Sequence, residues 1–553
     1  MKSLTLLALS AVVAKASPTA EPIHPNHDSA KANANHIFNA IHSAGRQWGS
    51  SLNHNGFGFI PVTLSAGTLL YHGSFSKNPP EDLEWLAFEV EHAENFVRTA
   101  RHPPKPPKGP PEHGEQPHEP SSPQKPLGQP EMNDSPDRGS ETRTRGYLQT
   151  YQTTRDVQLL YVDGSGAAKS PIGTLDSQDY VLFPNSSWEW HNFPSEIQRA
   201  KAMCDMITKW GWAGIMRMEI GYEIIWCDFN TDLQHESSMR SLIPEERLKE
   251  EDFLGTYLWT RAVAERYDGL GGDRVKVDFS SMISGFFFPI NISNTDPERP
   301  DLIRFKAAKE EHRWQIRTYL QKVFAGPRRF NVNWQGVVDM IVTRFSKRLA
   351  AMVSAHVSAD IFIGELEHTV LTYYEAPSLP GDVTLAADDD DRNKTAEAID
   401  RCAKNYLKPA QLSRQNWTLQ DDLIHTALSV VMQHICNDLY VARSILLQVA
   451  PDTSTDAYFI DKSINNNDMD KAVNQSRAIV RNLVDELAWT TWRKPQLCAE
   501  DEVLTTVMWP FGNSEDFYNP GCVSFKEITE DRRGYWKQYE KIPGRPDPRR
   551  PNE

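Results

Sequence analysis

The first half of the chain combines helical patterns with short apolar runs. Residues 27–51 and 195–210 repeat apolar positions at the spacing of a helix. Between and after them lie runs of mainly apolar residues, bounded by glycine or polar turns, that predict strands. These runs are residues 56–64, 67–73, 146–153, 157–164 and 214–229. The mixture predicts an α+β domain within residues 17–240, in which helices pack on a sheet.

Beyond residue 245 the pattern becomes helical. Apolar residues recur at i, i+3, i+4 and i+7, which places them on one face of each helix. The clearest sets are Ile316, Tyr319, Leu320 and Val323; Val338, Ile341, Phe345 and Leu349; Leu428, Val431 and Ile435; and Ile479, Leu483 and Leu487. Residues 274–292, RVKVDFSSMISGFFFPINI, fit either a short strand pair or a buried connector. We therefore expect a mainly helical domain over residues 245–545.

A proline-rich segment interrupts the first domain. Residues 102–130 hold 11 prolines in 29 residues and offer almost nothing to bury. Because proline fixes φ and lacks a backbone donor, we expect an extended, solvated loop within an insertion that spans residues 102–145. Its histidines, His102, His113 and His118, have no second cluster of metal ligands nearby in the sequence, so we expect no metal site.

The N-terminus has the features of a secretion signal. Residues 1–16 contain a lysine near the start, an apolar stretch over residues 4–13, and Ala14-Lys15-Ala16, the small-x-small pattern that precedes a cleavage site. The apolar stretch is too short to span a bilayer, and no later run of about 20 apolar residues follows. We therefore expect a secreted, extracellular protein without a membrane anchor, whose mature chain starts at residue 17.

The cysteines and glycosylation sequons fit the secretory route. The six cysteines form an even number that suits an oxidising compartment, and six cysteines allow 15 pairings. We assign only Cys204 with Cys227, because a helix followed by a strand can bring these two together. Five glycosylation acceptors of the Asn-x-Ser/Thr type occur, at Asn185, Asn291, Asn393, Asn416 and Asn474.

The charge balance argues against nucleic acid as a partner. The formal net charge is −15, and loss of the two signal lysines lowers it to −17. Such a surface repels phosphate backbones. The acidic run ADDDDRN, residues 387–393, lacks the alternation and the glycine of a calcium-binding loop, so we expect a solvated loop there.

Several common catalytic patterns are absent from the sequence. Residues 159–170, LLYVDGSGAAKS, have Asp163 and Ala168 where a phosphate-binding loop needs glycine. The chain has no G-x-S-x-G nucleophile elbow and no H-E-x-x-H zinc motif. Paired carboxylates for glycoside hydrolysis cannot be located among 74 acidic residues. A secreted hydrolase of extracellular polymers, with its carboxylates in the helical domain, therefore stays an open alternative.

The strand over residues 67–73 runs into Tyr71-His72-Gly73-Ser74, a polar group that contains a glycine. This ending resembles the opening motif of the ADP-ribosyltransferase fold, in which LYHGS or LWHGT begins the NAD site. The resemblance implies that His72 bonds a ribose hydroxyl, that the backbone of Gly73 holds the nicotinamide carboxamide, and that Ser74 also belongs to the cofactor site. Glycine suits this role because a side chain would block the ligand. The alternative is that His72 closes a surface strand and Gly73 serves its turn.

Two further stretches occupy the places that this resemblance requires. Residues 84–97, EWLAFEVEHAENFV, correspond to an aromatic strand and a short helix, and Phe88 stands where a tyrosine stacks on nicotinamide in that family. Residues 221–229, GYEIIWCDF, correspond to the strand with the catalytic glutamate. On one strand Glu219 and Glu223 would share a face. Glu223, or failing that Glu219, would stabilise the oxocarbenium-like ribose as nicotinamide leaves. The alternative for Glu223 is a position on the solvent face of a half-buried sheet.

A second resemblance covers most of the chain. RQWGSSLNHNGFGFIP, GTLLYHGS and GTLDSQDY resemble a group of secreted proteins of filamentous fungi that have no assigned activity. Two hypotheses therefore stand beside the hydrolase: an NAD-dependent ADP-ribosyltransferase or NAD glycohydrolase, and a non-catalytic secreted binding or effector protein whose partner is an unknown protein or small molecule. The NAD hypothesis requires that His72 and Glu223 line one cleft.

Overall fold

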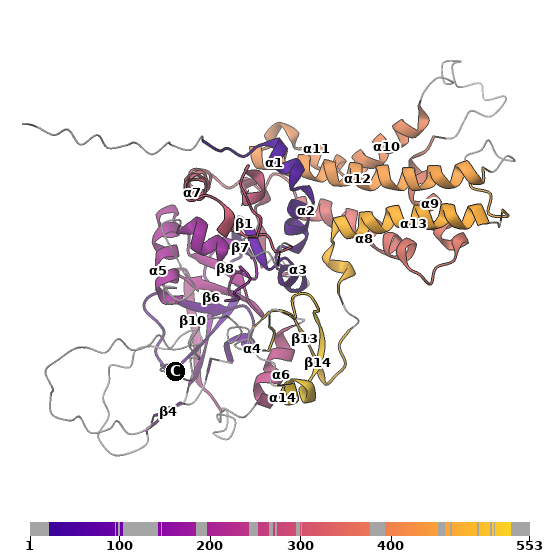
Figure 1. Ribbon diagram of the computed structural model, residues 1–553. Helices are drawn as coiled ribbons and strands as arrows, with labels where there is room; N and C mark the ends of the chain where they lie inside the picture. Colours follow the sequence, from indigo (N-terminus) through magenta and orange to yellow (C-terminus); the bar gives the residue numbers. More distant parts are fainter. Residues whose placement is uncertain are drawn as a thin grey trace, which may run out of the picture.

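The fold described here is that of a computed structural model (Figure 1). It describes residues 22–531, except for residues 95, 98–99, 103–141, 145, 184–195, 243–252, 265–268, 271–273, 295–298, 300, 376–392, 452–458, 465–466, 495–496, 509–510 and 514. The expected signal segment, nearly all of the proline-rich insertion, the acidic residues 387–392 and the sequon at Asn185 lie outside the described residues.

A curled mixed sheet of ten strands forms the N-terminal part of the protein (Figure 1). Its order is β10-β6-β2-β3-β9-β8-β7-β1-β11, and β12 also pairs with β1. Pairing is antiparallel throughout except between β7 and β8. The strands are β1 Asn55–Leu64, β2 Leu69–Ser74, β3 Glu84–Ala87, β6 Tyr147–Thr153, β7 Val157–Gly164, β8 Gly214–Met218, β9 Tyr222–Trp226, β10 Leu233–Arg240, β11 Val275–Val277 and β12 Ile283–Ser284.

The central strands are nearly continuous apolar runs because both of their faces are covered. Every residue of β8 and β9 is buried, as is almost every residue of β1 and β7. Helices α2 (Ala34–Ser43) and α3 (Gln47–Leu52) pack against β7, and α5 (Glu196–Ile207) packs against β8. β4 (Ala100–His102) and β5 (Thr142–Thr144) pair at the two ends of the insertion, so the chain re-enters the same unit.

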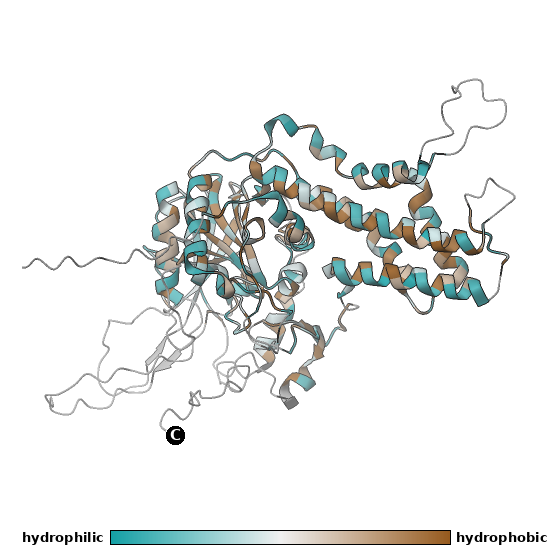
Figure 2. Cartoon of the chain, turned by 45° about the horizontal axis from the view of Figure 1, so that its top comes forward, coloured by the Kyte–Doolittle hydropathy of each residue, from teal (hydrophilic) through white to brown (hydrophobic). Residues whose placement is uncertain are grey.

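The C-terminal part is mainly helical, which together with the sheet confirms the α+β prediction. The apolar stripes of its long helices face one another, while their outer faces are polar (Figure 2). The remaining helices are α1 His27–Ala32, α4 Val90–Glu94, α6 Phe253–Ala264, α7 Glu310–Phe324, α8 Trp334–Val353, α9 Ala359–Val370, α10 Lys394–Asn405, α11 Lys408–Gln411, α12 Leu419–Val449, α13 Asn467–Leu487 and α14 Phe525–Asp531. No helix among the described residues is long and apolar enough to cross a bilayer.

The two parts share one apolar core. Helix α2, near the N-terminus, packs against α12 and α8 of the helical part as well as against β1 and β7. The stretch 274–292 supplies β11 and β12 to the sheet, so it continues the sheet rather than only connecting it to the helices. A small hairpin, β13 (Glu502–Thr505) with β14 (Gly521–Ser524), lies near α6 and α14.

The single strand expected over residues 214–229 is wrong. The chain forms two antiparallel strands, β8 and β9, joined by Glu219, Ile220 and Gly221. A Cβ on Gly221 would lie 2.9 Å from Val263 and 3.0 Å from the ring of His92, so glycine lets the turn pack closely there. The hairpin places Arg217 directly opposite Glu223, whereas Glu219 lies in the turn. Glu219 and Glu223 therefore do not share one strand face.

Three disulfides are present, and Cys204–Cys227 confirms the one pairing assigned from the sequence. It links α5 to the residue that follows β9. Cys402–Cys436 joins α10 to α12, and Cys498–Cys522 ties the β13–β14 hairpin to the segment before it. Each bridge closes a loop of fewer than 40 residues, so each restrains one local unit.

Candidate functional site

His72 and Glu223 lie two strands apart and line the same cavity. Tyr71 on β2 pairs with Ala87 on β3, and Ala87 pairs with Glu223 on β9, so the three strands carry the motifs side by side. The cavity has a volume of about 20 Å³. Its lining comes from β2, β3, β9 and the α4 segment: Tyr71, His72, Gly73, Glu84, Trp85, Leu86, Ala87, His92, Ala93, Phe96 and Glu223.

His72 is a buried, neutral histidine. Its Nδ1 lies 2.8 Å from the carbonyl oxygen of Trp85, and only a protonated ring nitrogen can donate to that acceptor. Burial lowers the pKa of His72 to about 4, although the bond to Trp85 opposes the shift. Nε2 of the neutral ring is therefore a hydrogen-bond acceptor.

Glu223 is held by a buried arginine from the neighbouring strand. Nε of Arg217 donates to Oε1 of Glu223 at 2.9 Å, and both side chains are almost fully buried. The other carboxylate oxygen, Oε2, is buried and has no hydrogen-bond partner among the described residues. Burial raises the pKa of Glu223, while Arg217 opposes that shift. The carboxylate thus keeps one oxygen free to accept a hydrogen bond.

Arg217 is one member of a larger buried network. Its Nη1 donates to Gln178 at 3.0 Å and its Nη2 to Glu196. Glu196 also accepts a hydrogen bond from Arg199 at 2.6 Å, and Arg199 donates to Asp179 at 2.8 Å. Burial alone would raise the pKa of Glu196, but Arg217, Lys169 and Arg199 hold it well below the usual range.

Glu219 lies beside this network and holds its proton more tightly than an exposed glutamate does. Burial raises the pKa of Glu219 to about 8, and the negative charge of Glu223 adds to the shift, while Lys169 opposes it. For Asp179 and Glu223 burial also raises the pKa, and the neighbouring arginines, Arg199 and Arg217, oppose that rise. Pairing of opposite charges is what a buried ionic cluster needs to persist.

Two further titratable side chains line the cavity. Burial raises the pKa of Glu84 to about 7, which is suited to proton transfer at neutral pH. Burial lowers the pKa of His92 to about 4, and its Nδ1 is buried without a hydrogen-bond partner among the described residues. The sequence motifs did not predict Glu84 or His92 as site residues.

The other residues expected in the site have structural contacts. A Cβ on Gly73 would overlap the carbonyl oxygen of Ala93 and lie 3.0 Å from Phe96, so the segment that follows β3 covers this glycine. Oγ of Ser74 accepts a hydrogen bond from the backbone of Ser76. Phe88 is buried with the guanidinium of Arg274 5.7 Å from its ring centre. The described lining of the cavity includes neither Ser74, Phe88 nor Glu219.

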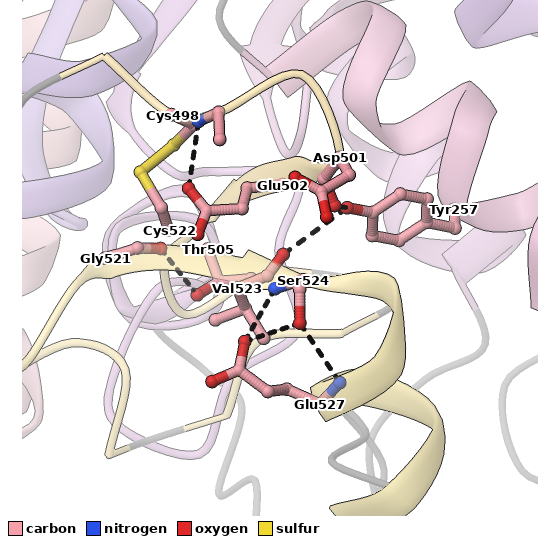
Figure 3. The surroundings of a disulfide bond; sticks show 11 residues. Tyr257, Cys498, Asp501, Glu502, Thr505, Gly521, Cys522, Val523, Ser524 and Glu527 are labelled. Atoms are coloured by element: carbon pink, nitrogen blue, oxygen red, sulfur yellow. Dashed lines mark hydrogen bonds between the residues drawn. A yellow bond between two sulfur atoms is a disulfide. The ribbon is translucent and has the colours of Figure 1, made fainter.

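A metal site does not emerge from the described residues. They contain one group of three potential ligands, Cys498, Glu502 and Cys522. The two sulfurs are bonded to each other, and Glu502 accepts a hydrogen bond from the backbone of Ala499 (Figure 3). Because a metal needs thiolates rather than a disulfide, these residues support the hairpin rather than a metal centre.

The network residues could have been suspected from isolated charges in apolar stretches. Arg217 stands alone within GIMRM, and Arg199 lies on the α5 helix that packs against the same strand. A lone charge in a buried strand needs a partner, and the partner of Arg217 lies just across the hairpin. The π-helical segment Ser177–Leu182, which supplies Gln178 and Asp179, carried no comparable signal.

Comparison with known proteins places the chain among fungal proteins. Residues 27–249 match the family model described as the YPL277C N-terminal domain. The uncharacterized protein YOR389W of Saccharomyces cerevisiae is 25% identical over 556 residues, which cover 87% of this chain and 83% of that protein. The uncharacterized protein YPL277C of the same yeast is 30% identical over 221 residues, covering 38% of this chain and 44% of that protein. No solved structure matches the chain significantly. Over residues 27–249 the chain is thus similar to the family described as the YPL277C N-terminal domain.

Proposed function

We propose that the sheet part of this secreted protein binds NAD and cleaves its nicotinamide–ribose bond, in the manner of ADP-ribosyltransferases or NAD glycohydrolases. One observation carries the proposal. Glu223 has a buried carboxylate oxygen without a hydrogen-bond partner among the described residues, and the same residue lines a cavity together with His72. Such an oxygen can accept a hydrogen bond from a hydroxyl group, and the nicotinamide ribose carries two adjacent hydroxyls, at C2′ and C3′.

The proposed reaction breaks the C–N bond between C1′ of the ribose and the nicotinamide nitrogen. The bonding electrons leave with nicotinamide, and positive charge develops on the ribose. Glu223 accepts a hydrogen bond from a ribose hydroxyl and stabilises that charge, while Nε2 of His72 accepts from the other hydroxyl. Water, or a protein side chain, then attacks C1′ and loses one proton, which leaves ADP-ribose or its protein adduct.

Arg217 serves as a positioning residue in this proposal. It binds Oε1 of Glu223, so it fixes the carboxylate while leaving Oε2 available. Because the guanidinium lies directly across the β8–β9 pair, the hairpin itself sets the orientation. The buried network behind Arg217 then holds the guanidinium in turn.

Entry of NAD requires a movement of the segment that covers Gly73. A cavity of about 20 Å³ holds roughly one water molecule, which is far less than a nucleotide needs. The cover consists of the five-residue helix α4 and Phe96. We propose that this segment moves away from β2. The movement would expose the backbone of Gly73 together with the side chains of His72 and Glu223.

A non-catalytic binding protein is the second candidate, and the same cover favours it. With Gly73 packed against Ala93 and with Phe88 absent from the described cavity lining, the backbone contact and the stacking contact expected for nicotinamide are both missing. On this proposal the ionic network stabilises the sheet, and the protein acts through its surface. Both proposals assume that the protein is secreted and glycosylated. The three disulfides suit an oxidising compartment, and the sequon residues Asn291, Asn416 and Asn474 are exposed.

Nicotinamide release from NAD separates the two candidates. The purified chain, its Glu223→Gln variant and the control Glu365→Gln are incubated with NAD, and nicotinamide is measured by chromatography. Glu365 pairs with Arg348 in the helical part, so its substitution makes the same chemical change as Glu223→Gln but outside the candidate site. We expect release by the wild type and the control and at least a hundredfold less by Glu223→Gln, the scale of one lost electrostatic contact in a transition state. Equal release from all three, or none from the wild type, removes the catalytic proposal.

A further inference from the structure

A second, larger cavity lies away from His72, on the side of the sheet where α2 and α3 pack. Its volume is about 130 Å³. It is bounded by α2, α3, the start of β1, the end of β7 and two later segments around residues 301–303 and 517. Exposed His36 and Asp301 stand among the residues that line it, so the cavity opens to solvent at that edge.

Its inner wall holds a histidine nitrogen without a partner. His54 is 2% exposed, and its Nε2 has no hydrogen-bond partner among the described residues. Burial, with Arg304 nearby, lowers the pKa of His54 to about 3, although a backbone contact with Ile172 opposes that shift. The ring therefore stays neutral, and its Nε2 is an unused hydrogen-bonding atom.

The neighbouring asparagine, Asn55, holds a second polar atom without a partner, an acceptor. Nδ2 of Asn55 donates to the carbonyl oxygens of Ile172 and Ile303, at 2.8 and 3.0 Å. Those bonds fix which end of the amide is the oxygen, and Oδ1 is then buried without a partner among the described residues. Two adjacent residues of the cavity lining thus each hold a buried polar atom that has no hydrogen-bond partner among the described residues.

Other groups in the lining limit what can bind. Asp163 accepts a hydrogen bond from the backbone of Gly58 at 2.7 Å and carries a carboxyl group into the wall. The rings of Phe57, Phe286 and Phe517 supply apolar surface, and the centre of the Phe517 ring lies 4.2 Å from that of His54. The wall therefore combines hydrogen-bond acceptors with flat apolar faces.

This combination selects a neutral ligand with several hydroxyl donors. The oxygens of Asn55 and Asp163 favour a ligand that donates hydrogen bonds. A metal ion needs three converging ligands, and the described residues form no such group at this cavity. A polyol satisfies the unused hydrogen-bonding atoms of His54 and Asn55, and the C–H face of a sugar ring packs on aromatic rings.

We propose that this cavity binds a neutral monosaccharide-sized polyol, with His54 Nε2 and Asn55 Oδ1 hydrogen-bonded to its hydroxyls and Phe517 packing on the ring at the rim. A cavity of roughly 150 Å³ accommodates a six-membered ring such as benzene, so the ring of a sugar would fill this cavity and its outer hydroxyls would lie toward the open edge at His36 and Asp301. The site is separate from the His72–Glu223 cavity, so it does not depend on the proposed NAD chemistry.

The test is calorimetric titration of the full chain with glucose, mannose, galactose and myo-inositol, each used singly. We expect saturable binding of at least one probe. His54→Phe should weaken it about tenfold, the scale of one lost hydrogen bond, whereas His54→Gln keeps an acceptor and should stay within a few fold. Glu223→Gln should bind like the wild type.

Phe517→Ala keeps the test decisive if His54→Phe does not fold. Phe517 is only half-buried, so its removal leaves the core intact and should weaken binding of the same probe several fold. The proposal is overturned if none of the four probes binds, if His54→Phe and Phe517→Ala bind as the wild type does, or if glucosamine binds through its ammonium group while the neutral sugars do not.

Discussion

Replacing Arg217 with methionine should make the protein much easier to unfold, because it leaves the buried carboxylate of Glu223 without an ionic partner. The side chain of Arg217 is 1% exposed and binds Glu223, Glu196 and Gln178. After Arg217→Met, Glu196 still has Arg199, but Glu223 loses its direct ionic partner. Breaking a buried pair from one side costs about 3–5 kcal/mol. We expect the free energy of unfolding to fall by that amount.

Urea denaturation at pH 7 and thermal melting measure the loss. For a folding unit of roughly 150–250 residues, such as the sheet part, a loss of about 3–5 kcal/mol in the free energy of unfolding lowers the melting temperature by roughly 6–20 °C. Arg155→Met is the control: its ion pair with Asp232 is exposed on the arginine side and should contribute less than about 1 kcal/mol. Adding Glu223→Gln to Arg217→Met removes the stranded charge and should restore at least about 1.5 kcal/mol.

A loss of less than about 1 kcal/mol for Arg217→Met would refute this reasoning, because it would mean that the carboxylates of Glu223 and Glu196 find water or other partners. An additive double variant would likewise show that Arg217 and Glu223 do not act as a pair.

Three further predictions concern other parts of the molecule. Gly73→Ala should destabilise the chain by about 1–3 kcal/mol, because its Cβ would overlap the backbone of Ala93; urea melts that coincide with the wild type would contradict the close packing. His72 should titrate with a pKa of about 4 in histidine NMR spectra. Because this pKa lies below the unfolded value, the free energy of unfolding should fall, by about 3 kcal/mol at most, as the pH falls from about 6.5 toward 4. An ordinary pKa would show that the site is open to solvent. Asp421→Ala should cost about 2–4 kcal/mol, because the buried carboxylate caps α12 and accepts hydrogen bonds from Ser280 and Trp334; a change under about 1 kcal/mol would contradict that.

Local patterns predicted most elements of the fold. The apolar sets around Ile316, Ile341, Val431 and Leu483 lie on α7, α8, α12 and α13, because a helix buries one face whatever its neighbours are. The strand order and the packing of α2 on α12 depend on contacts between segments far apart in the sequence. Periodicity carries no information about such contacts.

The candidate site was predictable only in part, for a related reason. The motif at His72 and the carboxylate at Glu223 are visible as short stretches, and the structure brings them to one cavity. The turn that separates Glu219 from Glu223 was missed because RMEIGYEII reads as one alternating strand. Gly73 is covered by Ala93 and Phe96. The sequence does not show that these two residues pack against it.

A crystal structure of Glu223→Gln in complex with NAD tests the central proposal most directly, since this variant should bind NAD without consuming it. The proposal predicts that the nicotinamide ribose lies between His72 and residue 223, that α4 and Phe96 have moved away from Gly73, and that Arg217 still holds the side chain at position 223. NAD bound elsewhere, or no NAD with the cover closed over Gly73 as it is here, would contradict the proposal.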